Sequence, residues 1–285
     1  MLEHNEIYCG DSFELAEQVE DKSIDLILED MPYNITACKW DVKIDLEKYW
    51  ESRKRIIKDN GAIVLTASQP FTSVLVVSNL GMFKYCWHWN KGKAKNYLNA
   101  RKQPMRIIEE IVVFYKNQCS YSPQLSQREK RHIRNNGKTY KATNNGVFGK
   151  INPTRKLNEG RIIPIDLKYP DDLLNINGVN SFGFEKTGHP TQKPVEFFKY
   201  LIKTYTNEND LVFDGFLGSG TTAVACKQLN RNYIGIEKEQ KYFEIANKRL
   251  TGICDYKEEI INFCKPKNIK IPFVHKEDRE HISTT

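Results

Sequence analysis

Two stretches of the chain combine residue types that do chemistry, and the first is rich in glycine. The sequence LVFDGFLGSGTTAVACKQLNRNYIGIE (211–237) is typical of a strand, a glycine turn, a helix and a second strand that ends in an acid. Glycines at 215, 218 and 220 let backbone approach a ligand closely, and Glu237 is placed to accept hydrogen bonds from two ribose hydroxyls. This pattern predicts a site for a cofactor that contains a nucleoside.

The spacing within this loop bears on which cofactor it takes. Gly218, Gly220 and Ala223 also fit a dinucleotide fingerprint, in which the glycines follow the strand almost directly. Here Asp214 ends the strand, and Gly-Phe-Leu intervenes before Gly218. A wide turn with an acid at its lip suits a ligand that carries a positive group and no pyrophosphate. The amino-acid end of S-adenosyl-L-methionine has this character.

The second stretch, ILEDMPYN (27–34), runs from an apolar strand into a loop. Asp30, Pro32 and Tyr33 put a carboxylate, a stiff ring and an aromatic face where the strand ends. Ligands of open α/β sheets bind outside the carboxyl ends of the strands, so this position is a candidate for chemistry. A solvated acid beside a packed tyrosine is the structural alternative.

Taken together, DGFLGSGTT with GIE, the preceding HPTQKP (189–194) and the early DMPY closely resemble the β class of DNA amino-methyltransferases. In that family the catalytic half precedes the cofactor half, which is the order found here. The resemblance covers roughly residues 4–250. It implies S-adenosyl-L-methionine as cofactor, double-stranded DNA as substrate, no metal, and a homodimer, since members are often dimeric.

The same resemblance implies roles for single residues. The loop from Asp214 to Gly220 wraps the methionine part of the cofactor, Glu237 holds the ribose, and Asp11, in YCGDS, meets the adenine amino group. HPTQKP lies near the methionine end, although a lysine at a helix start is also commonly just solvated. The cofactor residues implied are Asp11, Asp214, Phe216, Gly218, Gly220, Thr221, Glu237, Thr191 and Lys193.

The catalytic residues implied are Asp30, Met31, Pro32 and Tyr33. The lone pair of an exocyclic base amine is conjugated with the ring, so the amine is a poor nucleophile. Two acceptors, the Asp30 carboxylate and the main-chain carbonyl of residue 31, draw that lone pair out of conjugation and aim it at the methyl group. Tyr33 offers a ring on which the flipped base stacks, worth about 1–3 kcal/mol.

The usual family motif is DPPY, and here Met31 replaces the first proline. A carbonyl can come from any residue, and Pro32 biases residue 31 toward extended geometry. The reaction therefore stays the expected one. Because Asp rather than Ser opens the motif, adenine N6 is favoured over cytosine N4 as the methylated atom, and cytosine N4 is kept as the alternative.

The basic character of the chain is concentrated in one segment. The chain has a net charge of +7, and residues 117–168 hold 11 Lys or Arg against 3 acids. The segment is rich in Gly, Asn and Pro, and the resemblance places the family's target-recognition region there, although a solvated loop would have a similar composition. The residues expected to bind DNA are Arg128, Lys130, Arg131, Arg134 and Lys138.

Short apolar runs alternate with amphipathic stretches elsewhere, which predicts an α/β fold, Rossmann-like, of the class I methyltransferase type. The resemblance adds that the fold is circularly permuted. Strands are expected at Glu6–Cys9, Ile24–Asp30, Ala62–Ala67, Phe83–Trp89, Ile107–Tyr115, Leu211–Asp214 and Tyr233–Glu237. Helices are expected at Ser12–Val19, Asp45–Lys58, Phe71–Leu80, Pro194–Thr206, Thr221–Leu229 and Gln240–Leu250.

Two strands joined without a helix predict an antiparallel edge on a mostly parallel sheet. The expected division is a catalytic half (1–116), a target-recognition insertion (117–188), a cofactor half (189–251) and a C-terminal extension (252–285). The stretch WHWNKGKAKNYLNARKQP (87–104) offers a loop that can touch phosphates or the flipped base, while its tryptophans suit packing.

Composition narrows the class of protein further. The seven cysteines show no CxxC or zinc-ligand spacing, so they are expected to be reduced thiols. No run of roughly 20 apolar residues is present and the first residues are polar, which predicts a cytoplasmic protein without a membrane span.

Three other functions fit the sequence less completely than DNA methylation does. A nicotinamide-dependent dehydrogenase would explain Gly218, Gly220 and Glu237 but not DMPY or HPTQKP. A protein glutamine methyltransferase would carry Asn at position 30, with the motif after the glycine turn. A DNA-binding module without catalysis would not need both Asp30 and Asp214.

Overall fold

The computed structural model describes residues 1–33, 44–128, 167–180 and 185–252. An eight-stranded sheet runs through these residues in the order β1-β10-β9-β2-β3-β5-β4-β8. Its strands are β1 (Glu6–Cys9), β2 (Ile24–Glu29), β3 (Ile57–Ala67), β4 (Phe83–Lys95), β5 (Arg106–Phe114), β8 (Leu173–Asn175), β9 (Leu211–Asp214) and β10 (Asn232–Glu237). The short strands β6 (Ser126–Gln127) and β7 (Leu167–Lys168) form a separate pair.

The direction of the strands confirms the expected fold class. Strands β1, β10, β9, β2 and β3 are parallel to one another, and β5 is antiparallel to both β3 and β4. Strand β8 pairs in parallel with β4, His88 facing Leu173, at the outer edge. The sequence predicts no strand there, so residues 173–175 extend the main sheet from within the polar segment 117–188.

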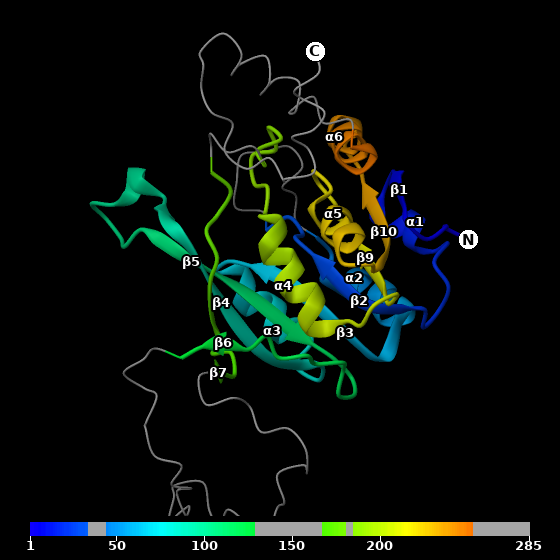
Figure 1. The fold of residues 1–285 in the computed structure, drawn as a ribbon, viewed down its shortest axis with the longest axis horizontal. Helices are drawn as coiled ribbons and strands as arrows, with labels where there is room; N and C mark the ends of the chain where they lie inside the picture. Colours follow the sequence, from blue (N-terminus) through cyan, green and yellow to red (C-terminus); the bar gives the residue numbers. More distant parts are fainter. Residues whose placement is uncertain (34–43, 129–166, 181–184, 253–285) are drawn as a thin grey trace, which may run out of the picture.

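Helices cover both faces of the sheet (Figure 1). They are α1 (Ser12–Ala16), α2 (Leu46–Ile56), α3 (Phe71–Ser78), α4 (Val195–Tyr205), α5 (Thr221–Gln228) and α6 (Gln240–Thr251). One core cluster joins the sheet to α4, α5 and α6, and the other joins it to α1, α2 and α3. Within the described ranges, no helix has the length and apolarity needed to cross a bilayer.

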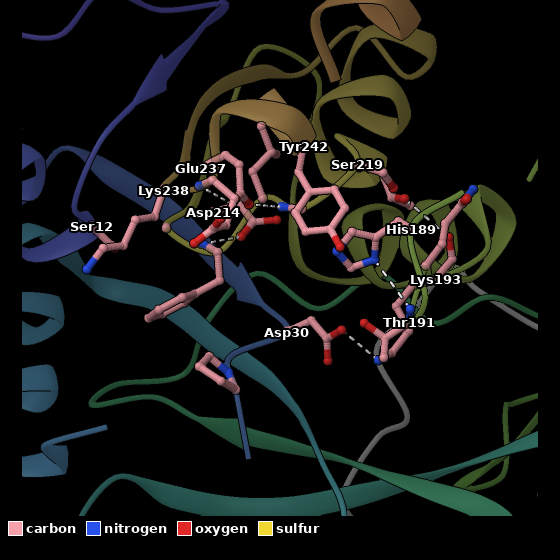
Figure 2. A pocket seen from close by; sticks show the side chains of 18 of the residues that line it. Ser12, Asp30, His189, Thr191, Lys193, Asp214, Ser219, Glu237, Lys238 and Tyr242 are labelled. Atoms are coloured by element: carbon pink, nitrogen blue, oxygen red, sulfur yellow. Dashed lines mark hydrogen bonds and ion pairs between the residues drawn. The ribbon is translucent and has the colours of Figure 1, made fainter. Parts of the chain in front are cut away.

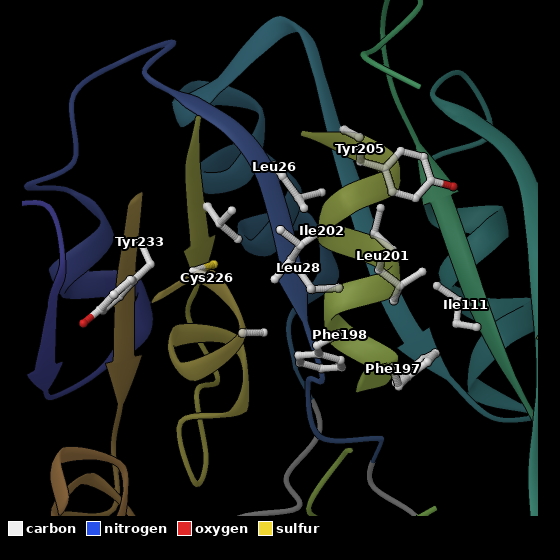
Figure 3. Packing of buried hydrophobic residues seen from close by; sticks show 14 of the residues in the cluster. Leu26, Leu28, Ile111, Phe197, Phe198, Leu201, Ile202, Tyr205, Cys226 and Tyr233 are labelled. Carbon is white, nitrogen blue, oxygen red and sulfur yellow. The ribbon is translucent and has the colours of Figure 1, made fainter. Parts of the chain in front are cut away.

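The central strand β2 is buried on both faces, as expected for a parallel strand between two helical layers. Leu26 and Leu28 face the layer with α4, whereas Ile27 faces the layer with α2. Figure 3 shows α4 laying Phe198 and Leu201 against the sheet beside Leu28. Each such side chain contributes about 1.5–3 kcal/mol when it is fully buried.

The start of β3 differs from the sequence prediction. The DNG sequence (59–61), expected to be a turn before the strand, lies inside β3, which begins at Ile57 directly after α2. The register shifts between the pairs Ile24–Ile57 and Leu26–Ala62. A bulge therefore absorbs the extra residues, so that a turn-like sequence is accommodated without ending the strand.

Candidate active site

A cavity of about 300 Å³ opens at the carboxyl ends of the parallel strands (Figure 2). Four of the acids expected at strand ends line it, and they follow or end β1, β2, β9 and β10: Asp11, Asp30, Asp214 and Glu237. The volume is at the lower end of the range for ligand sites, roughly 300–1,000 Å³. Convergence of strand ends from both halves of the chain explains why these residues meet.

Asp214 closes β9 and shapes the glycine loop that follows. Its side chain is 2 % exposed, and Oδ1 accepts a hydrogen bond from the backbone N–H of Phe216 at 2.9 Å. Oδ2 accepts from the Thr222 hydroxyl at the start of α5. Burial raises the pKa of Asp214 well above its usual range, although the Thr222 and Phe216 donors act to lower it. The carboxyl group therefore ties the strand to the loop and the helix.

Glu237 performs the equivalent task at the end of β10. Its Oε2 accepts from the backbone N–H of Gly218 at 2.6 Å, and Oε1 accepts from that of Glu239 at 2.8 Å. Gly218 has φ +56°, a left-handed conformation that favours glycine. Burial raises the pKa of Glu237 despite these two donors. The acid predicted to bind ribose thus also fixes the loop.

A buried ion pair lies beneath the glycine loop. Arg53 of α2 and Glu29 of β2 are both fully buried, with Nη2 and Oε1 2.9 Å apart. The backbone N–H of Gly215 donates to Glu29 Oε1 at 3.0 Å, and Arg53 donates to the Ser12 hydroxyl at 2.6 Å. A Cβ on Gly215 would lie 2.4 Å from Arg53 Nη2, so only glycine fits there. The sequence analysis did not identify this pair.

Asp11 caps the N-terminus of α1 and also lines the cavity. Oδ1 accepts from the backbone N–H of Phe13 at 2.9 Å, and Oδ2 lies 3.1 Å from the Lys238 ammonium. Partial burial opposes ionisation, but the Phe13 N–H and Lys238 outweigh it and lower the pKa of Asp11. Asp11 lines the cavity as an ionised acceptor.

Asp30 is held by side chains from three other positions in the sequence. Lys193 Nζ donates to Oδ2 at 2.7 Å, and the Tyr33 hydroxyl donates to Oδ1 at 2.7 Å. The hydroxyl of Thr66, near the end of β3, also donates to Oδ1. Figure 2 shows Asp30 facing the segment that carries Thr191 and Lys193. Lys193 is therefore a buried partner of Asp30 and is not a solvated lysine.

Glu109 of β5 completes this cluster, and the sequence analysis missed it. It lies 3.0 Å from Lys193 Nζ and 3.2 Å from Lys91 Nζ. Burial acts to raise the pKa of Glu109, but the two ammonium groups outweigh it and lower it. Burial alone would lower the pKa of Lys193, whereas Asp30 and Glu109 raise it. Two carboxylates and two ammonium groups thus meet in one cluster of ion pairs.

His189 and Tyr242 form one wall of the cavity, with ring centroids 4.3 Å apart (Figure 2). His189 belongs to the quoted HPTQKP motif, but the sequence analysis assigned it no role of its own. Burial lowers its pKa to about 4, with Asp30 acting in the opposite direction. Tyr242, on α6, carries no sequence signal because it falls in an ordinary amphipathic helix.

Most of the predicted site residues come together around this cavity. Those that line it are Asp11, Asp30, Pro32, Thr191, Lys193, Asp214, Phe216, Gly218, Thr221 and Glu237. Three others do not line it. Gly220, at φ +82°, caps α5, and a Cβ added there would lie 2.9 Å from Ala246. Met31 is buried in the core. The Tyr33 ring stacks on Phe71.

Most of the predicted DNA-binding residues lie outside the part of the chain that the structure describes. Lys130, Arg131, Arg134 and Lys138 lie outside the described residues, as do 253–285. Arg128 is exposed and donates Nε–H to the Leu167 carbonyl at 2.7 Å. Over the described part of the chain, no group of three or more His, Cys, Asp or Glu is arranged to hold a metal ion.

A mostly parallel sheet, an acid-rimmed glycine loop and an acceptor carboxylate on the neighbouring strand define a class I methyltransferase fold. The family described as DNA methylase, of the N6/N4 methyltransferase type, matches residues 24–248. The chain therefore belongs to this family of DNA amino-methyltransferases.

Individual relatives agree with this assignment. The Type II methyltransferase M.HpaI of Haemophilus parainfluenzae is 27% identical over 95% of this chain and 82% of its own length. M1.MboII of Moraxella bovis is 27% identical over 87% and 96%. The solved complex of M1.HpyAVI with SAM (S-adenosyl-L-methionine) superposes with a TM-score of 0.58 at 27% identity, covering 86% of this chain and 98% of that one.

Proposed function

We propose that this chain is a site-specific DNA methyltransferase that transfers a methyl group from S-adenosyl-L-methionine to the exocyclic amine of a flipped base, with adenine N6 as the favoured atom. The observation that carries the proposal is the position of Asp30. This acceptor lies in the same cavity as the Asp214–Gly220 loop and Glu237.

The cofactor is S-adenosyl-L-methionine, the ligand seen in the M1.HpyAVI complex. When bound, it supplies a methyl group on a sulfonium centre. Glu237 and Asp11 are the acceptors for its ribose and adenine ends, and the carboxyl group of Asp214 faces the methionine end. Phe216 adds an apolar wall, and both Gly218 and Thr191 line the space between. The residues present fit this cofactor.

Asp30 accepts a hydrogen bond from the target amine, and the main-chain carbonyl of Met31 accepts the second. The amine must become tetrahedral to serve both acceptors, which frees its lone pair for in-line attack on the methyl carbon. Met31 suits this role because its side chain is 1% exposed, in the core, so only the backbone is left for the reaction. Holding both reactants in place contributes about 7–11 kcal/mol.

Lys193 donates to Asp30 Oδ2 and holds that carboxylate in position as an acceptor before the base arrives. As the amine acquires positive charge, the paired carboxylates Asp30 and Glu109 stabilise it electrostatically. The extra proton leaves the methylated amine through the Asp30 carboxylate. No covalent link between chain and substrate is required.

Adenine N6 is favoured over cytosine N4 because the motif opens with Asp30. The PvuII DNA methyltransferase, which is cytosine-N4-specific, superposes with a TM-score of 0.59 at 18% identity, a likeness that concerns the fold alone. Cytosine N4 is the second candidate, with the same mechanism, because the matched family covers both N6 and N4 methylation. Membership of the DNA methylase family argues against the dehydrogenase and the protein methyltransferase.

The test is incubation of the purified protein with labelled S-adenosyl-L-methionine and mixed-sequence duplex DNA, then nucleoside digestion and mass spectrometry. Labelled N6-methyladenine is the expected product. Labelled N4-methylcytosine would keep the mechanism and reverse the base. No labelled nucleoside, with cofactor binding intact, would overturn the proposal.

A further inference from the structure

Thr66 lies near the end of β3, level with the acid proposed to receive the target amine. Strands β2 and β3 are parallel, and Glu29 pairs with Leu65 in their register. The next residues along the chain are Asp30 and Thr66, so the register brings these two side chains to the same edge of the sheet. The pairing of the strands therefore places a hydroxyl beside the Asp30 carboxylate.

The side chain of Thr66 occupies a position that would suit an apolar residue. It is fully buried, and Val64, two residues earlier on the same face of the strand, belongs to the core cluster with α4. A buried hydroxyl costs free energy unless it is hydrogen-bonded, whereas valine has a similar shape and no such cost. Packing alone therefore does not account for a threonine at this position.

The hydroxyl of Thr66 has both of its partners in the segment 30–33. It donates to Asp30 Oδ1, and it accepts from the Tyr33 hydroxyl at 2.7 Å. The Tyr33 hydroxyl is also 2.7 Å from Asp30 Oδ1, so the three oxygen atoms form a closed triangle. A hydroxyl has one proton and two lone pairs, so Thr66 can donate to the acid and accept from the phenol at the same time.

Each of the two side chains that Thr66 links has a second anchor. Lys193 Nζ lies 2.7 Å from the other carboxylate oxygen, Asp30 Oδ2. The Tyr33 ring stacks on Phe71 at the start of α3, with centroids 5.4 Å apart and an angle of 24° between the planes. Because Thr66 contacts both Asp30 and Tyr33, its hydroxyl sets the orientation of the carboxylate relative to the ring.

We propose that Thr66 is a positioning residue for methyl transfer, whose hydroxyl holds the Asp30 carboxylate and the Tyr33 ring in the relative orientation that the target base requires. This inference rests on the proposed function, in which Asp30 accepts from the target amine, and on the expected stacking of the base on Tyr33. A misplacement of about 1 Å can slow a reaction about 10²-fold, so a hydroxyl that touches both groups has a large effect on the rate.

The variant Thr66→Val tests the inference, because it removes the hydroxyl and nearly keeps the shape of the side chain. At saturating S-adenosyl-L-methionine and mixed-sequence duplex DNA, the rate of labelled methyl transfer by the full chain is expected to fall about 10–100-fold. The Kd for S-adenosyl-L-methionine should keep its wild-type value, because Thr66 does not line the cavity that holds the cofactor acids. Thr66→Ser restores the hydroxyl and should recover most of the lost rate.

Thr204→Val is the matched control. Thr204 is also fully buried, and its hydroxyl donates to the Tyr200 carbonyl at 2.7 Å, at the end of α4 that lies away from Lys193. The substitution makes the same chemical change outside the cavity, so the rate of methyl transfer should equal that of the wild type. Both variants should unfold at similar thermal midpoints, so that the loss of rate in Thr66→Val is not a loss of folded protein.

A double-mutant cycle separates positioning from a purely structural role. Tyr33→Phe keeps the ring and removes the phenol hydroxyl, which is one of the two partners of Thr66. Both substitutions disrupt the same hydrogen-bonded triangle, so their effects on the rate should not be independent. The double variant Thr66→Val/Tyr33→Phe should therefore be slowed by clearly less than the product of the two single effects.

The result for the wild-type protein distinguishes a failure of this inference from a failure of the proposed function. A wild-type rate in Thr66→Val, or a Thr66→Ser variant as slow as Thr66→Val, would overturn the inference and leave the proposed function intact. Single effects that multiply fully in the double variant would overturn it in the same way. If the wild-type protein transfers no labelled methyl group to DNA, the proposed function fails and the inference fails with it.

Discussion

The cavity contains carboxylates that are held in two different ways. On the cofactor side, Asp11, Asp214 and Glu237 each accept a hydrogen bond from the backbone N–H two residues further along. On the catalytic side, Asp30 is held by the side chains of Tyr33, Thr66 and Lys193, the last of these 163 residues away in sequence.

This difference has a physical meaning. A carboxylate held by its own backbone is fixed by local turn chemistry, so the cofactor surface is formed wherever the strand ends correctly. A carboxylate held mainly by distant side chains depends on the whole fold. The cofactor side is thus set largely by local turns, whereas the catalytic side is set by contacts between distant parts of the chain.

The largest expected effect comes from Asp30→Ala. The variant removes the carboxylate that accepts a hydrogen bond from the target amine, so methyl transfer should fall by about 10⁴-fold. Cofactor affinity should stay within a few fold, because the backbone-held acids are unchanged. Single-turnover kinetics and calorimetry measure the two quantities. A variant with near-normal turnover would refute the two-acceptor mechanism.

Arg53→Met should show that the glycine loop on the cofactor side depends on the buried pair of Arg53 and Glu29. Removing Arg53 leaves Glu29 buried without its counter-charge, which costs about 3–5 kcal/mol in the free energy of unfolding. Denaturant titration gives this value. Lys54→Met, at the neighbouring exposed position, is the matched control and should change stability by less than about 0.5 kcal/mol. Equal effects for the two variants would contradict the assigned role of Arg53.

Lys193→Met tests how the carboxylate cluster is kept charged. Without the ammonium group, Glu109 loses the counter-charge that lowers its pKa, so this pKa rises. Turnover near neutral pH should fall about 10²-fold, and the acid limb of the pH–rate profile should move to higher pH. Lys193→Arg keeps the charge and should keep the position of that limb. An unshifted profile in Lys193→Met would rule out this electrostatic role.

Glu237→Gln should weaken the cofactor side without destroying it. The substitution keeps the shape but replaces one acceptor oxygen by a donor that faces backbone N–H groups. A loss of about 1.4 kcal/mol, or tenfold in the Kd for S-adenosyl-L-methionine, is expected. Calorimetry measures it, and an unchanged Kd would remove Glu237 from ribose binding.

The smallest effect concerns His189. Its Nε2 atom would lie 3.4 Å from a Cβ added to Gly218, so the ring packs against the glycine loop. The charge of Asp30 acts to raise its pKa. Its pKa is about 4 in the folded chain against an ordinary 6.5, so the unfolded state takes up its proton first as pH falls. Stability should decrease by about 1 kcal/mol between pH 6.5 and about pH 5.5.

Denaturant titrations at these two pH values would measure this change. His189→Gln should lack this contribution, since glutamine does not titrate. The other titrating groups are common to both proteins and cancel in the comparison. If the wild type and the variant lose stability in parallel, His189 does not carry the pH dependence.

The same contrast explains what the sequence could predict. Local signals predict strands such as β2 and β9, because these are short apolar runs. Glycine spacing and an acid at a strand end predict the cofactor acids. Glu109 was not predictable, because nothing in the local sequence of β5 marks this acid until Lys193 approaches it from a position 84 residues later in sequence.

Other differences arise where tertiary pairing overrides local preference. The three residues of β8 carry no period of their own and become a strand because β4 offers an open edge. The DNG sequence is a strong turn signal, yet β3 continues through it, because the pairs Ile24–Ile57 and Leu26–Ala62 on either side hold the strand to β2. The buried pair of Arg53 and Glu29 was not predictable either. From the local sequence, Arg53 resembles an exposed charge on a helix, and Glu29 resembles a polar residue at a strand end.

The position of β2 between β3 and β9 has a consequence for synthesis of the protein. One edge of β2 gains its neighbour only when β9 has been translated, about 180 residues after β2 itself. At about 5–20 residues per second, that edge waits about 10–40 s on the ribosome. An unpaired apolar strand is prone to aggregation in that interval. We therefore expect the nascent chain to be a client of ribosome-associated chaperones until β9 closes the sheet.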